Sequence, residues 1–287
     1  MFIEALPYSD EPTSEGNYHL WQLSPAIDAG NNDAMNLPEK DLDGEPRIQG
    51  DNDDGEKVVD MGAYEGGTVP PRYYVDSEAT DGGDGSSWED AFQGLEDALE
   101  ASSVSEIWVA GGRTYTSTMR EYNPIFKTIG SFNIKTGIQV YGGFSGDESI
   151  RSDRNWFENE TILTNPDHQV VTFQSAPNTT VLDGFTIKGP EVPPSGWGAS
   201  RHYGISNKNG SPRISNCTII GNYNYGIYNE VTLSGTANPT LTNCIIKDNK
   251  GGIRNKAYGN HTTASPTLIN CVISDNPGIG FYNEHSN

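Results

Sequence analysis

Five aromatic residues lie close together in the second half of the sequence, and side chains of this type could bind carbohydrate. An aromatic ring has a flat apolar face on which the apolar face of a sugar ring can stack. Aromatic side chains are more often packing residues, so the alternative is that the tyrosines fill the corners of the fold. The residues concerned are Trp197, Tyr203, Tyr223, Tyr225 and Tyr228.

Two acidic loops nearer the N-terminus could bind a cation. Ca²⁺ takes roughly six to eight oxygen ligands, which closely spaced carboxylates supply. A full EF-hand loop starting at Asp51 would need a glutamate where the sequence has Gly62, so a solvated turn is the alternative. Calcium is the one cofactor that the sequence suggests. The carboxylates that would bind it are Asp41, Asp43, Asp51, Asp53 and Asp54.

The elements that would position the aromatic side chains follow a repeat of 27 residues. Pro212, Pro239 and Pro266 keep this period, and an Asn-Cys pair follows each of them at the same distance. A fixed period of roughly 20–50 residues indicates a solenoid. The apolar residues alternate in twos between Gly, Pro and Asn, so the units are predicted to be strands and turns. A second motif, which reads Gly, Ile or Phe, any residue and Asn, begins at Gly204, Gly226, Gly252 and Gly280.

Each unit predicts short strands that are separated by bends. Cys217 and Ile219 are two residues apart and share one face of a strand. Ile214 lies three residues before Cys217, so both can point inward only if the chain bends between them, at Asn216. Asparagine tolerates the left-handed conformation that such a bend needs. We expect Asn222 to bend the chain again, which completes one coil of a parallel β-helix.

Stacked coils would bring like residues about 4.8 Å apart and so form ladders. We interpret the cysteine ladder as small buried apolar side chains, because free cysteine is usually buried and no histidine shares the period. A disulfide between neighbouring coils is geometrically possible but would leave one thiol unpaired. The corner amides can hydrogen-bond along the axis of the stack. The two ladders are Cys217, Cys244 and Cys271, and Asn216, Asn243 and Asn270.

These Asn-Cys-x-Ile units resemble the right-handed parallel β-helix proteins of the pectate-lyase-like superfold. They look like the large bacterial surface and secreted β-helix families, which include polymorphic outer-membrane proteins. The resemblance implies an all-β fold. This is a right-handed single-stranded parallel β-helix, a solenoid with an N-terminal capping helix, preceded by a small irregular β segment. The same fold hosts lyases, hydrolases, adhesins and structural proteins, so it does not fix an activity.

Residues 1–66 resemble, motif for motif, the choice-of-anchor Q segment that closes many bacterial β-helix proteins. The motifs include Ser24 to Gly30 and Val59 to Glu65. Residues 67–72 are a linker by composition, and residues 73–287 form the β-helix, with a cap at 73–104 and coils at 105–287. Within the cap we expect a helix from Trp88 to Glu100, with Ser87 as its N-cap.

The resemblance also implies which catalytic groups an enzyme of this fold would use. Hydrolases of this fold use clustered aspartates, and the adjacent pair Asp53-Asp54 lies in the anchor-like segment rather than on the coils. Lyases of this fold use an Arg or Lys base beside calcium-binding acids, and no spacing singles out such a set. Catalytic residues are therefore unassigned, and whether the protein is an enzyme stays open.

The charge balance restricts the classes of partner. With 39 acidic and 18 basic residues the net charge is −21, so nucleic acid and anionic membrane surfaces are poor partners. No stretch is long and apolar enough to span a bilayer, and the N-terminus carries no signal peptide. We expect an extracellular or cell-surface location in a bacterium, with the signal peptide outside this chain.

Two functions are consistent with these observations. The first is a secreted or cell-surface structural or adhesive β-helix that binds polysaccharide or other surface components and is part of a longer multi-unit protein. The alternative is a polysaccharide lyase or glycoside hydrolase that acts on an extracellular polysaccharide. Residues 1–66 of one copy could also cover the coil at 280–287 of the next. This would give head-to-tail filaments, and a truncated gene model is the alternative.

Overall fold

The computed structural model describes residues 30–42, 46–48, 58–63, 72–101, 105–117, 130–149, 151–190, 202–232, 235–258 and 262–286. The chain divides into two compact units, Met1–Pro71 with Glu148–Arg154, and Arg72–Asp147 with Asn155–Asn287. The described part of the first unit contains an isolated antiparallel bridge between Lys40 and Pro46 and the 3-10 helix η1, Arg151–Asp153. Most of residues 1–66 lie outside the described residues, so the anchor-like segment remains an expectation.

The second unit is built from three parallel sheets. The first sheet contains, in spatial order, β1 (Arg72–Val75), β2 (Glu106–Ala110), β5 (Gln139–Phe144), β8 (Val181–Asp183), β11 (Arg213–Ser215), β14 (Thr240–Thr242) and β17 (Thr267–Ile269). The second contains β3 (Arg113–Thr116), β6 (Thr161–Thr164), β9 (Phe185–Lys188), β12 (Thr218–Ile220), β15 (Ile245–Lys247) and β18 (Val272–Ser274). The third contains β4 (Phe132–Ile134), β7 (Val171–Gln174), β10 (Ile205–Lys208), β13 (Tyr225–Val231), β16 (Gly251–Tyr258) and β19 (Phe281–Ser286).

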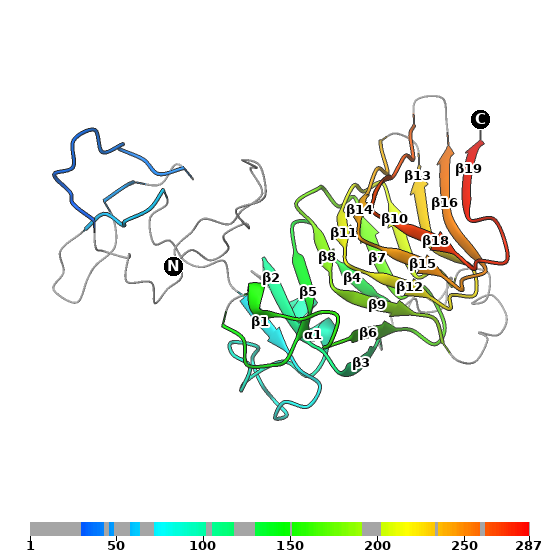
Figure 1. Cartoon of the computed structure of the whole chain (residues 1–287), viewed down its shortest axis with the longest axis horizontal. Coiled ribbons are helices and arrows are strands. Elements are labelled where there is room, and N and C mark those ends of the chain that lie inside the picture. The colour runs from blue at the N-terminus through cyan, green and yellow to red at the C-terminus, as the bar shows by residue number, and fades with distance from the viewer. Residues whose placement is uncertain are drawn as a thin grey trace. The chain divides into compact units, whose positions relative to one another are not determined.

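The order of the strands shows a solenoid. From β2 onward the chain adds one strand to each sheet in turn before it returns to the first sheet one layer higher. Figure 1 shows β13, β16 and β19 side by side as consecutive layers of one sheet. The predicted all-β parallel β-helix is therefore confirmed.

Left-handed residues make the corners of the coils. Asn216 has φ 51° and Asn243 has φ 54°, so the first predicted bend is where the sequence places it. The second bend was expected at Asn222, and this is wrong. The left-handed residue is the one before it, Gly221 with φ 71°, and Asp248 with φ 55° takes this place one coil later. Glycine and aspartate tolerate this conformation, which leaves the side chain of Asn222 free to point inward.

The inward asparagines form buried amide ladders. Asn222 donates from Nδ2 to Oδ1 of Asn249 at 2.8 Å, one coil further on. A second ladder explains the repeated motif that begins with glycine, since its asparagines are bonded to one another. Asn207, Asn229 and Asn255 are buried, and Asn283 in the last layer is exposed. The hydrogen bonds join Asn207 to Asn229 at 3.1 Å, Asn229 to Asn255 at 2.8 Å, and Asn255 to Asn283 at 2.8 Å. Buried polar groups of this kind stay inside a core because each has a partner.

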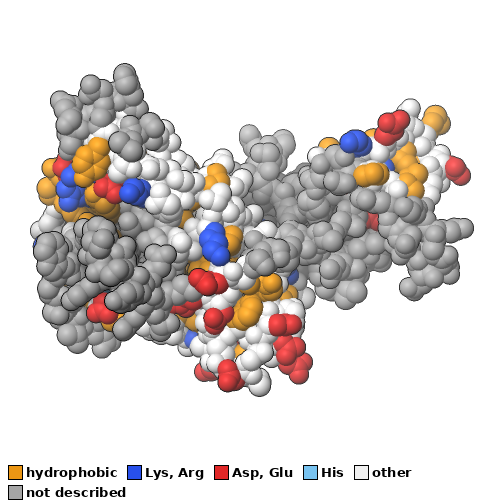
Figure 2. All heavy atoms as spheres, turned by 180° about the vertical axis from the view of Figure 1, so that it is seen from behind, with side chains coloured by type: hydrophobic (Ala, Val, Ile, Leu, Met, Phe, Trp, Pro, Cys, Tyr) orange, Lys and Arg blue, Asp and Glu red, His pale blue; other side chains and the backbone are white. Residues whose placement is uncertain are grey.

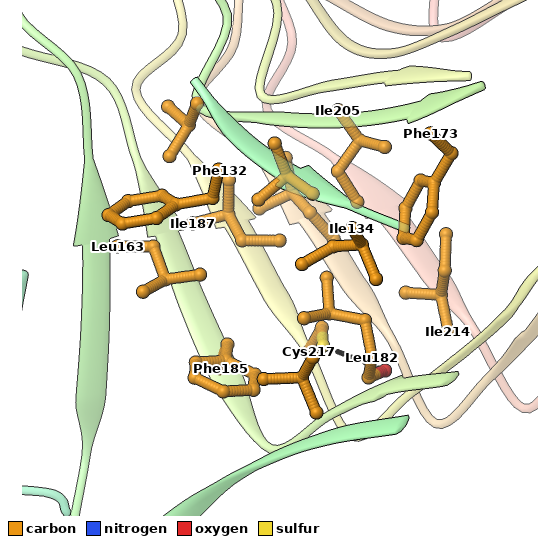
Figure 3. Packing of buried hydrophobic residues seen from close by; sticks show 14 of the residues in the cluster. Phe132, Ile134, Leu163, Phe173, Leu182, Phe185, Ile187, Ile205, Ile214 and Cys217 are labelled. Carbon is orange, nitrogen blue, oxygen red and sulfur yellow. Dashed lines mark hydrogen bonds between the residues drawn. The ribbon is translucent and has the colours of Figure 1, made fainter. Parts of the chain in front are cut away.

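The cysteines line the interior of the solenoid with hydrogen-bonded thiols. Figure 3 shows the Cys217 side chain beside Leu182, whose carbonyl oxygen accepts the thiol at 3.8 Å. Cys244 donates to the carbonyl oxygen of Ile214 at 3.5 Å, and all three cysteines are free. Cys217 and Cys244 are buried, but Cys271 is half-buried. The expectation of three buried thiols is wrong for Cys271, because β17 and β18 are the outermost strands of their sheets.

The helix of the cap is shorter than the sequence predicts. α1 spans Leu95–Glu100 rather than starting at Trp88. Phe92 pairs with Val75 in a parallel bridge, and its N–H donates to the carbonyl oxygen of Tyr74 at 2.9 Å, so this stretch is extended. Ser87 still caps a turn, since its Oγ accepts the N–H of Asp90 at 3.0 Å. The apolar side chains of α1, among them the buried Leu95, join the core of the coils.

Candidate functional site

The outer face of the third sheet brings tyrosine and charged side chains together. Along β13 the side chains alternate, so that Ile227 and Asn229 are buried inside while Tyr228 and Glu230 are half-buried on the outer face. The next strand, β16, repeats the pattern with Arg254 on the outer face. This face therefore carries a continuous column of side chains across the layers.

Arg254 lies between two tyrosine rings. In the strand register Tyr228 pairs with Arg254, and Arg254 pairs with Tyr282. The guanidinium carbon of Arg254 lies 5.7 Å from the ring centroids of both Tyr228 and Tyr282, and 5.6 Å from that of Tyr225. Contacts of a guanidinium with ring faces at this distance are attractive, so the tyrosines hold the cation in a fixed place.

Two further tyrosine contacts extend this surface. Tyr203 stacks on Tyr228 with ring centroids 4.6 Å apart and an angle of 14° between the planes. Tyr225 covers Gly251 on the next strand, where an added Cβ would lie 2.6 Å from the ring. A side chain at position 251 would therefore displace the Tyr225 ring from this place. We call this surface the tyrosine–arginine strip, and its members are Tyr203, Tyr225, Tyr228, Arg254 and Tyr282.

A column of alternating charge runs beside the strip. Lys208, Glu230, Lys256 and Glu284 are aligned in the register of β10, β13, β16 and β19. Nζ of Lys256 lies 3.0 Å from a carboxylate oxygen of Glu284, and Arg254 donates to the other oxygen of the same carboxylate. On the face that Figure 2 draws, charged side chains of both signs lie among uncharged ones.

The neighbours of Glu284 and Tyr228 set the protonation states of these two groups. Hydrogen bonds from Arg254 and then Lys256 lower the pKa of Glu284, so it is a carboxylate at neutral pH. Burial, followed by the charge of Glu230, raises the pKa of Tyr228 well above its ordinary value. Tyr228 is therefore a neutral phenol that donates to Glu230 at 3.3 Å, and neither group matches a general acid or base poised near pH 7.

The structure brings together three of the five predicted aromatic residues. Tyr203, Tyr225 and Tyr228 belong to the strip, whereas Tyr223 lies apart and contacts His202 edge-on with ring centroids 6.1 Å apart. Trp197 lies outside the described residues. Sequence reasoning missed Tyr282 and the role of Arg254 in this surface. The signal was present, because the third residue of each glycine motif forms the column, as Ser206, Tyr228, Arg254 and Tyr282.

The expected calcium ligands are not tested by the structure. Of the five aspartates, Asp41 is described, and Asp43, Asp51, Asp53 and Asp54 lie outside the described residues. Across the described ranges no group of three His, Cys, Asp or Glu side chains is placed to hold a metal ion. Calcium binding by this segment stays a prediction from the sequence.

The fold agrees with a known family. The family model described as the right-handed beta helix region matches residues 107–287, which is more than half of the chain. The chain belongs to the right-handed β-helix family. The match includes the whole tyrosine–arginine strip and does not extend to residues 1–66.

Other comparisons leave the activity of this β-helix open. No curated protein and no solved structure is significantly similar to it. Among the residues that the structure describes, no helix is long and apolar enough to cross a membrane. Because proteins of one fold can have unrelated activities, function must be inferred from the strip itself.

Acidification should destabilise the corner of the β-helix that precedes the strip. The ring of His202 is buried, its Nε2 lies 3.0 Å from the carbonyl oxygen of Asn165, and burial lowers its pKa below the ordinary value. The nearby charges are those of His168, which opposes protonation, and Asp167, which favours it. The unfolded chain binds the proton more readily, so this contribution to stability is complete above about pH 6.5 and is lost as pH falls.

Urea unfolding between about pH 7.5 and about pH 5.5 measures this effect. Each pH unit can remove at most about 1.4 kcal/mol per titrating group. In the variant His202→Gln the free energy of unfolding should depend less on pH, because glutamine does not titrate. An equal dependence on pH in both proteins would contradict the assignment of the effect to His202.

Proposed function

We propose that the protein is a secreted or cell-surface structural β-helix that binds polysaccharide through the tyrosine–arginine strip. The observation that carries this proposal is the aligned column of Tyr228, Arg254 and Tyr282, with Tyr203 and Tyr225 beside it. The side chains are half-buried, so each exposes part of its surface to solvent while packing fixes its position.

The side chains of the strip and those beside it suit the binding of a polysaccharide. Tyrosine offers an apolar ring with a polar hydroxyl at its end, and Arg254, Lys256 and Glu230 add hydrogen-bonding groups on either side. The layers of a sheet lie about 4.8 Å apart, so an extended polymer that crosses the strands meets tyrosine or charged side chains at successive layers. An outer face of this kind also suits an adhesive or structural protein of the cell surface.

Replacing Tyr228 with leucine tests the proposal. Native-gel affinity electrophoresis against a panel of extracellular polysaccharides should show retardation of the wild-type protein by at least one polymer. Tyr228→Leu removes the ring that contacts both Tyr203 and Arg254, and we expect binding to weaken by about tenfold, which is about 1.4 kcal/mol. Tyr223→Leu is the matched control, because Tyr223 lies outside the strip, and it should bind like the wild type.

Two results would contradict the proposal. Lack of retardation of the wild-type protein by every polymer would remove the binding function. Equal weakening by Tyr223→Leu and Tyr228→Leu, with both variants folded by circular dichroism, would place the binding surface elsewhere.

The alternative enzyme function would use the same face. Glu230 and Glu284 lie two strands apart, with Lys256 between them in the register. Inverting glycosidases use two separated carboxyl groups, one of which must act as an acid. The lowered pKa of Glu284 suits the base of such a pair but not its acid. Release of reducing ends or of unsaturated product from a bound polymer would favour the enzyme instead.

A further inference from the structure

We infer that the strip selects anionic polysaccharides, whose carboxylate or sulfate groups bind between Arg254 and Lys256. This inference rests on the proposed function, since it names the chemistry of the ligand for the same surface. Three observations carry it: the charge balance of the face, the arrangement of the two cations around Glu284, and the spacing of the cations along the column.

The charge of this face is opposite to that of the whole protein. On the outer sides of β10, β13, β16 and β19 the basic residues are Lys208, Arg254 and Lys256, whereas the acidic residues are Glu230 and Glu284. The chain as a whole has 39 acidic and 18 basic residues. Charges are screened over about 8 Å at physiological ionic strength, so a ligand on this face responds to the local excess of positive charge.

Arg254 and Lys256 are already arranged around a carboxylate. Both bind the side chain of Glu284, one to each oxygen. Two cations share one anion, which leaves the pair with a net positive charge. The guanidinium is planar and is held between Tyr228 and Tyr282, so its donors are preorganised for an anionic oxygen pair. Glu284 therefore acts as an internal competitor that an anionic substituent of a polymer can replace.

The cations repeat along the direction in which a polymer would lie. Lys208 and Lys256 are two layers apart in the same column, which is about 10 Å at the usual strand spacing. Glu230 lies between them and bonds to the hydroxyl of Tyr228. Alternate layers thus present a cation, which suits a linear polymer that carries its charges at regular intervals.

Matched pairs of polymers test this inference. Carboxymethyl cellulose is compared with hydroxyethyl cellulose, and dextran sulfate with dextran, at about 0.15 M salt. The two polymers of each pair share a sugar backbone and differ in charge, so their comparison shows the effect of charge alone. Comparison of the two charged polymers distinguishes binding of carboxylate from binding of sulfate. We expect the charged member of at least one pair to bind about tenfold more tightly. Arg254→Gln should remove that preference, and Glu284→Gln should increase it because the internal competitor is gone.

The control is Lys247→Gln, which removes a cation from the outer side of β15 in another sheet and should leave the preference unchanged. Lys256→Gln is the second test if Arg254→Gln does not fold, and it should also reduce the preference. Equal binding of charged and neutral members, lost in Tyr228→Leu, would overturn this inference and leave the proposed function intact. Absence of binding to all polymers would overturn both. Weaker binding of the charged polymer by Glu284→Gln would show that Glu284 supports the site rather than competing for it.

Discussion

Replacing Trp108 with alanine should lower the free energy of unfolding by about 3–5 kcal/mol, the range found when a buried tryptophan is truncated. The indole is fully buried, stacks on Phe144 with ring centroids 4.4 Å apart, and donates its N–H to Glu106 at 2.5 Å. The Arg72 guanidinium lies 3.7 Å from the ring centroid. The truncation therefore removes apolar burial and also leaves the pairing of Arg72 with Glu106 without its cover.

The effect should be strong because Trp108 holds together a second apolar cluster. Its neighbours on β2, Ile107 and Val109, belong to the interior of the coils, so Trp108 points to the opposite face of the sheet. Trp88 covers it from the cap, with ring centroids 6.5 Å apart. Loss of the indole should loosen the cap from the first coils and expose the edge of β1.

Urea unfolding followed by circular dichroism measures the change, with Trp156→Ala as the matched control. Trp156 is 40% exposed, and its truncation should cost less than about 1 kcal/mol. A similar loss in both variants would show that the cluster around Trp108 contributes no special stability. Trp108→Phe should fall between the two, since it keeps an aromatic ring but not the hydrogen bond to Glu106.

The fold was predictable because the residue types in each repeat indicate where the chain bends. The direction of individual side chains could not be predicted in the same way. Asn216 could be placed at a left-handed bend because the parity of Ile214 and Cys217 requires one, and few residues tolerate it. The second corner could not be assigned in the same way. Gly221 and Asn222 both suit a bend. The structure shows that Gly221 makes it, while the Asn222 side chain points inward and donates a hydrogen bond to Asn249 in the next coil.

The cap shows how tertiary pairing overrides a local pattern. Phe92 and Leu95 lie at helical spacing, but Phe92 instead pairs with Val75 on a strand that lies earlier in the chain. The hydrophobic pattern contains no information about this partner. Helix propensity is a weak determinant where such pairing is available, so the helix begins only at Leu95.

The candidate site is better predicted by aligning the glycine motifs of successive coils than by grouping aromatic residues that are close in sequence. Tyr203, Tyr225 and Tyr228 were grouped because they are close in sequence, and the same rule included Tyr223, which contacts His202 rather than the strip. Tyr282 was missed because it lies two coils after Tyr228. Alignment of the glycine motifs places these residues in one column, but the sandwich around Arg254 depends on ring orientations that only the structure shows.

Replacing Asn229 with leucine should lower the free energy of unfolding by about 2–5 kcal/mol. Asn229 is fully buried, accepts a hydrogen bond from Asn207 at 3.1 Å and donates one to Asn255 at 2.8 Å. Leucine has a similar size but can make neither bond. An unpaired buried polar group costs about 1–3 kcal/mol, and both neighbours in the ladder lose a partner. Asn207 keeps its second bond, to the carbonyl oxygen of Gly210 at 2.9 Å, which limits the loss on that side.

The matched control for this substitution is Asn133→Leu in β4 of the same sheet. Asn133 lies on the exposed outer side of its strand, and the change there should cost less than about 0.5 kcal/mol. Urea unfolding of both variants and the wild type gives the comparison. If Asn229→Leu is as stable as Asn133→Leu, the amides contribute no net stability and the repeated asparagine must serve another purpose. If the loss is as large as expected, the ladder explains why every glycine motif ends in asparagine, since one apolar replacement breaks two layers of the stack.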